Sequence, residues 1–79
     1  MNYLGIDVRT KDARRLIARL KLLKSTISVE YGGAYWEDLG YSQVHLTTTW
    51  SKVELDDWLY RTKHGCRYVG TFELKRIES

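Results

Sequence analysis

The 79-residue chain contains no proline and a single cysteine. One cysteine excludes an internal disulfide and a cysteine-based zinc site, so a reducing cytoplasm is the expected compartment. No stretch approaches the roughly 20 apolar residues of a membrane span. The N-terminus has no basic start followed by an apolar run, so we expect no signal peptide. Without a linker or low-complexity tract, residues 1–79 are expected to form one domain.

Aromatic residues are plentiful in contrast: three Trp, six Tyr and one Phe. Large rings supply much buried area per residue, which a small core needs. The charged fraction of 29% and the apolar fraction of 43% are values of globular proteins. A net charge of +3 permits a nucleic-acid partner without requiring one.

Alternating apolar and polar residues predict strands over 3–8, 27–31, 43–50 and 66–75. In the last strand we expect Tyr68 and Phe72 on the same face, and a central or long-edged position. Gly32-Gly33 is typical of a two-residue hairpin, after which residues 34–37 would form a short return strand. Residues 38–40 are expected to turn.

Two stretches have helical periodicity. In residues 10–24, Thr10 is the expected cap and the apolar stripe consists of Ala13, Leu16, Ile17, Leu20 and Leu23.

The second helix follows Ser51, which with Glu54 forms a capping box, while Trp50 and Leu55 have the spacing of a hydrophobic staple. Gly65 is its expected exit. Its inward stripe is Leu55, Trp58, Leu59 and Thr62, and its outward residues are Glu54, Asp56, Asp57, Tyr60 and Arg61.

This order predicts an α+β domain with an antiparallel sheet of four to five strands and two helices on one face. A ferredoxin-like βαββαβ arrangement is the natural candidate. An extra strand within residues 32–42 would give the five-stranded variant.

The first candidate site is the basic helix. Six of the thirteen Lys and Arg residues lie in it, against the single acid Asp12. Contacts to phosphates would bring affinity without sequence information, and the alternative is a solvated helix face. The residues proposed for nucleic acid are Lys11, Arg14, Arg15, Arg19 and Lys21.

A partner-binding surface is the second candidate. Exposed Tyr and Trp side chains are frequent binding anchors, and carboxylates on a rigid element can engage arginine-rich grooves. The alternatives are that the rings fill the core and that the helix acids complement the helix dipole. The proposed residues are Tyr35, Trp36, Glu37, Asp38, Asp56, Asp57 and Tyr60.

Catalytic and metal-binding patterns are weak. His64 and Cys66 could form a nucleophilic pair, but a helix-terminal histidine and a buried thiol explain them more simply. The scattered His, Cys and acidic residues have no metal-ligand spacing, and no glycine-rich phosphate loop is present. We therefore expect no enzyme, no metal and no cofactor.

The order Ser51, Leu55, Asp56, Trp58 and Tyr60 resembles one helix of a small phage-encoded inhibitor of the type I-F CRISPR surveillance complex. The likeness covers about a dozen residues, and the strand after Gly65 departs from it, because the similar protein continues with a further helix. The resemblance to anti-CRISPR proteins implies a short, non-enzymatic protein that binds subunits holding guide or target nucleic acid. It implies no particular binding residue.

We therefore expect a non-enzymatic, phage- or mobile-element-encoded protein that inhibits a host protein or ribonucleoprotein complex by occupying a surface. The alternative is a small nucleic-acid-binding module that contacts phosphates through helix 10–24. A third interpretation is an oligomer that pairs through the edge of its last strand. We expect a monomer or weak homodimer in the host cytoplasm.

Overall fold

The protein forms two layers, a sheet and a pair of helices, in a computed structural model that describes residues 1–36, 40–61 and 68–74. For Tyr35, Trp36 and Val69 only the backbone is described. The elements are β1 (Asn2–Arg9), α1 (Thr10–Lys21), β2 (Thr26–Trp36), β3 (Tyr41–Thr48), α2 (Lys52–Arg61) and β4 (Tyr68–Glu73).

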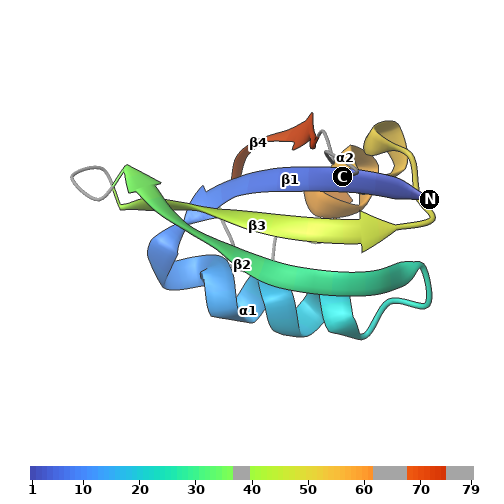
Figure 1. Cartoon of the computed structure of the whole chain (residues 1–79), viewed down its shortest axis with the longest axis horizontal. Helices are drawn as coiled ribbons and strands as arrows, with labels where there is room; N and C mark the ends of the chain where they lie inside the picture. Colours follow the sequence, from blue (N-terminus) through green and yellow to red (C-terminus); the bar gives the residue numbers. More distant parts are fainter. Residues whose placement is uncertain (37–39, 62–67, 75–79) are drawn as a thin grey trace, which may run out of the picture.

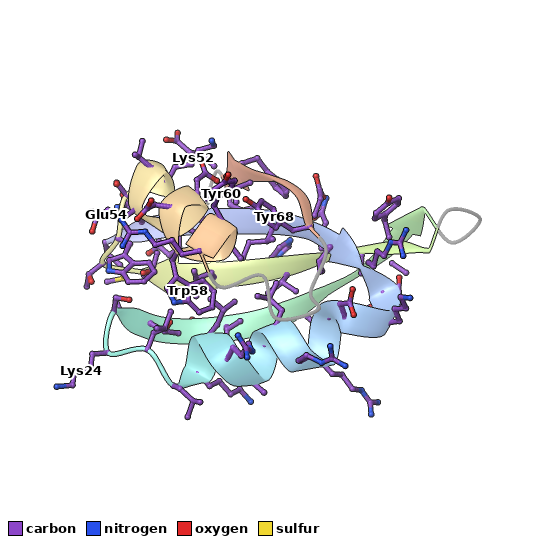
Figure 2. All side chains as sticks on the ribbon, turned by 180° about the vertical axis from the view of Figure 1, so that it is seen from behind. Lys24, Lys52, Glu54, Trp58, Tyr60 and Tyr68 are labelled. Atoms are coloured by element: carbon purple, nitrogen blue, oxygen red, sulfur yellow. The ribbon has the colours of Figure 1, made fainter. Side chains whose placement is uncertain are left out.

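The four strands form one sheet in the order β2-β3-β1-β4, and every neighbouring pair is antiparallel. β3 therefore lies between β1 and β2, and the Cα trace measures 32 × 32 × 19 Å. Both helices cover the same face of this sheet (Figures 1 and 2). The α+β class with four antiparallel strands is confirmed. The other sheet face, which we call the open face, is covered by neither α1 nor α2.

The core fills the space between the two layers. Every second residue of β3 is buried, as the alternation predicts. The buried apolar side chains are Leu4, Ile6, Val8, Ala13, Leu16, Leu20, Val44, Leu46, Leu55 and Leu59. Trp50 and Trp58 pack against this core with ring centroids 6.2 Å apart. The expected staple residue, Trp50, thus contacts the α2 ring Trp58 as well as the core that contains Leu55.

The Gly32-Gly33 pair does not form a hairpin, so this prediction is wrong. β2 continues to Trp36 and pairs with β3 on both sides of the glycines. The register shifts between Tyr31 and Gly33, and Gly33 has a φ of +96°, so the pair forms a bulge inside a long strand. A five-stranded sheet is likewise wrong for the part of the chain that is described.

The expected faces of the last strand are also wrong. Tyr68 pairs with Val8 and packs against the core, whereas Phe72 pairs with Gly5 and lies on the open face. A register shift beside Asp7 and Val8 breaks the alternation between them. β4 is an edge strand of the sheet.

The ends of α1 differ from the expectation. The N-cap is Arg9, without a side-chain cap, and the Thr10 hydroxyl instead hydrogen-bonds with the buried Ser42 hydroxyl at 2.7 Å. The helix ends at Lys21, before Lys24. Leu23 still packs against the core from outside the helix. The expected exit of α2 at Gly65, and the stripe residue Thr62, lie outside the described residues.

Candidate functional site

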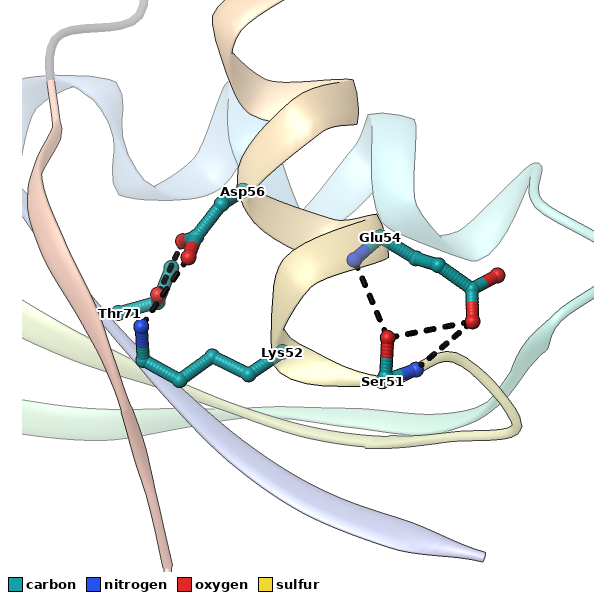
Figure 3. A network of polar contacts seen from close by, with 5 residues as sticks. All are labelled: Ser51, Lys52, Glu54, Asp56 and Thr71. Atoms are coloured by element: carbon teal, nitrogen blue, oxygen red, sulfur yellow. Dashed lines mark hydrogen bonds and ion pairs between the residues drawn. The ribbon is translucent and has the colours of Figure 1, made fainter.

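The start of α2 carries the capping box. The Glu54 backbone N–H donates to Ser51 Oγ at 3.2 Å, and the Ser51 backbone N–H donates to Glu54 Oε1 at 3.2 Å (Figure 3). Two backbone donors that the first helical turn leaves unpaired are thereby satisfied. Glu54 therefore has a structural role, although its side chain is exposed.

Asp56 is expected to point outward; its side chain is 39% exposed but turns toward β4. Its carboxylate pairs with Lys52 Nζ at 3.1 Å and accepts a hydrogen bond from the Thr71 hydroxyl of β4 (Figure 3). The sequence could not reveal this contact, because it depends on how β4 pairs with β1. Asp56 joins α2 to the sheet edge.

Asp57 is exposed, and its carboxylate pairs with Arg61 Nη2 at 3.1 Å, one helical turn along α2. Both α2 aspartates thus have a cation beside them, so little net negative charge remains at these positions. Glu37 and Asp38, the loop half of the expected acidic surface, lie outside the described residues.

Val53 and Tyr60 are the large hydrophobic side chains of α2 that are exposed to solvent. Val53 is 75% exposed and Tyr60 is 69% exposed. They are seven residues apart, two helical turns, and so lie on one side of the helix. Of the other expected aromatic anchors, Tyr35 and Trp36 lie at the end of β2, and Trp36 is opposite Tyr41 in the β3 register.

Tyr68, the first residue of β4, packs against the core and is close enough to Tyr60 of α2 to interact with it electrostatically (both labelled in Figure 2). Burial raises the pKa of the Tyr68 phenol above its ordinary value, and the Asp56 carboxylate and Tyr60 raise this pKa further. A neutral phenol at this place favours packing over acid–base chemistry at neutral pH.

The exposed charged residues of α1 are all basic. We call Lys11, Arg14, Arg15 and Lys21 the basic face, since all four are exposed and none pairs with an acid within residues 1–36, 40–61 and 68–74. Arg19, the fifth expected residue, is half-buried and takes part in a further interaction. The one acid of the helix, Asp12, is buried on its inner side.

The open face holds polar and aromatic residues that no sequence pattern indicated as a site. His45 Nε2 donates to Gln43 Oε1 at 3.0 Å. Tyr3, Glu30 and His45 line a shallow depression. The alternation within each strand predicts which residues share a face. Only the strand order shows that β1, β2 and β3 place these three residues side by side.

No group of three or more His, Cys, Asp or Glu residues in the described parts is arranged to hold a metal ion. His64 and Cys66 lie outside those parts. Neither described helix is long and apolar enough to cross a membrane.

Comparisons with known proteins give no identity for the chain. No family model matches it, and a search of the curated proteins finds no match. Functional conclusions therefore depend on the surfaces described above.

Proposed function

We propose that this protein is a small non-enzymatic binding module whose basic face contacts the phosphate backbone of a nucleic acid. The observation that carries this proposal is that the two helices differ in how their charged side chains are paired. The α2 aspartates have cations as neighbours, whereas the four cations of the basic face have no acid beside them in the described residues. Unpaired cations on a rigid helix release counterions from phosphates on binding.

The salt dependence of binding tests this function. Four phosphate contacts to duplex DNA predict that log K falls against log salt with a slope of about −3 to −4. The measurement is fluorescence anisotropy of a labelled mixed-sequence duplex and a single-stranded RNA at several salt concentrations. Absence of binding at every salt concentration would refute the proposal.

A matched pair of variants locates the contact. Arg14→Gln/Arg15→Gln removes two cations from the basic face and should make the slope of log K against log salt less negative by about 2. Lys52→Gln/Arg61→Gln removes two cations from α2 and should leave the slope nearly unchanged. Equal effects of the two double variants would assign the binding to net charge alone and not to the basic face.

A second candidate function is inhibition of a host protein or ribonucleoprotein complex in the cytoplasm, as in anti-CRISPR proteins of phages or mobile elements. It is supported by the exposed Val53 and Tyr60 on one side of α2, beside the Asp57–Arg61 pair. Tyrosine is enriched among residues that dominate binding energy. The further residues proposed for this surface remain Tyr35, Trp36, Glu37, Asp38 and Asp56.

Affinity capture from a bacterial lysate, with and without nuclease, separates the two functions. Protein partners that survive nuclease and are lost with Tyr60→Ala support the inhibitor. Partners that disappear with nuclease support the nucleic-acid module.

For the fold, we propose the ferredoxin-like class. The element order βαββαβ supports it, as does the placement of β3 between β1 and β2, which splits the β1–α1–β2 unit.

A further inference from the structure

The open face contains a depression of about 230 Å³ that extends across the strands. Tyr3 from β1, Glu30 from β2 and His45 from β3 line it, together with Leu74 just beyond β4. None of the helices covers this face (Figure 1). A depression of this volume can accommodate one side chain of a partner.

The rings of Phe72 and His45 lie against the backbone of this face, because the glycines beneath them have no Cβ. A Cβ on Gly5 would overlap the ring of Phe72, and a Cβ on Gly32 would overlap the ring of His45. Gln43 holds the His45 ring through its hydrogen bond at 3.0 Å. Rings that lie along a sheet can offer their π-faces to a partner above it.

The charge beside these rings is negative. Glu30 is exposed and lies opposite His45 in the β2–β3 register, and its carboxylate has no ion pair or hydrogen bond to another described side chain. Asp7 is on the same face of β1 but takes part in a further interaction, and Arg9, two residues on, lies opposite Tyr41. The basic face of α1 lies on the opposite side of the molecule. The open face therefore favours a cation.

We propose that the open face is a docking site for an arginine side chain of a protein partner, with Glu30 accepting from the guanidinium and the Phe72 and His45 rings stacking against it. A guanidinium is planar, stacks on aromatic faces and donates to carboxylates, which matches a carboxylate beside flat rings. Phosphates of a single-stranded nucleic acid would meet the Glu30 carboxylate. The site is independent of the basic face of α1.

The test is an NMR titration of the full chain with three peptides. The probes are acetyl-Gly-Arg-Gly-Arg-Gly-amide, its lysine counterpart and its citrulline counterpart, which keeps the planar shape without the charge. We expect shift changes at Glu30, His45 and Phe72, an affinity at least about twofold higher for arginine than for lysine, and no saturation with citrulline.

Single substitutions test the roles of Glu30 and Phe72. Glu30→Gln should weaken arginine binding about twofold to fivefold, as expected for an exposed ion pair, and Phe72→Leu should weaken it by a similar factor. Glu73→Gln removes the same charge from the exposed Glu73 of β4, which pairs with Leu4 in the register, and should change little.

Three results would overturn the proposal. One is equal binding by wild type and Glu30→Gln, and another is a set of shift changes confined to the helices. The third is a (dT)₈ oligonucleotide that shifts the same open-face resonances and binds with a higher affinity than the arginine peptide. The face would then bind bases.

Discussion

At the scale of single residues, Ser51 decides how α2 begins. Ser51→Ala removes the acceptor of the Glu54 N–H and should lower the free energy of unfolding by about 0.5–2 kcal/mol. Urea denaturation followed by circular dichroism measures this. Ser28→Ala, at an exposed serine of β2, is the control and should cost less than about 0.5 kcal/mol. A Ser51→Ala variant as stable as this control would show that the box contributes nothing.

The raised pKa of Tyr68 predicts how the stability of the protein changes at alkaline pH. Because the pKa of Tyr68 is raised in the folded protein, the unfolded chain loses its proton first, near pH 10. The stability that depends on this proton is present below about pH 10 and is lost as pH rises through the folded pKa. Tyr68→Phe should therefore flatten the decline of unfolding free energy between pH 9 and pH 11, roughly the range around that value.

The Asp56 carboxylate is one cause of this shift. Asp56→Asn should lower the pKa of the Tyr68 phenol, as followed by the ring ¹³C resonance during titration. An unchanged Tyr68 pKa in Asp56→Asn would exclude Asp56 as a cause of the raised pKa. An unchanged alkaline decline in Tyr68→Phe would exclude any contribution of Tyr68 to it.

These residues also show what the sequence can predict at this scale. The capping box was predictable because both partners, Ser51 and Glu54, lie within one helical turn. The Asp56–Thr71 contact was not, since fifteen residues separate its partners. Thr10 was expected to cap α1, but a tertiary partner, Ser42, takes its hydroxyl instead.

At the scale of elements, the bulge in β2 depends on one glycine. Gly33 has a φ of +96°, a conformation that side chains with a Cβ rarely adopt. Gly33→Ala should destabilise the protein by about 1–2 kcal/mol, as measured by urea denaturation.

Gly70→Ala is the matched control for this substitution. Gly70 lies in β4 without a positive φ, and a Cβ there would meet nothing within 4 Å. Its replacement should be neutral or stabilise the protein by up to about 1 kcal/mol. If both alanine variants had the same stability, backbone conformation at Gly33 would not be the cause.

Element existence was predictable and the exact pairing was not. Periodicity located the two helices and the strands, because each buries one face against the same core. The Gly32-Gly33 pair permits a hairpin and a bulge equally well, and only the pairing with β3 on both sides distinguishes them. The faces of Tyr68 and Phe72 were missed for the same reason, since a bulge in the last strand has no sequence signal of its own.

At the scale of the whole molecule, the two layers separate charge. The basic face is on the solvent side of α1, while Glu30 and Asp7 are on the open face of the sheet. The sequence indicated the basic helix, since its cations are contiguous along the chain. The composition of the open face depends on the strand order β2-β3-β1-β4, which places distant segments together.

This separation predicts how a polyanion stabilises the fold. A ligand that binds only the folded state adds about 2.7 kcal/mol at a hundredfold excess over its Kd, which corresponds to a rise in Tm of roughly 10–20 °C for a domain of this size. Heparin, in a thermal unfolding experiment at low salt, should raise the Tm of the wild type in this way. It should have little effect on a variant with all four residues of the basic face changed to Gln. Lys52→Gln/Arg61→Gln should keep most of the rise, because these cations are beside Asp56 and Asp57 on the other helix. A similar heparin effect on all three proteins would mean that the polyanion responds to net charge, and the basic face would lose its proposed role.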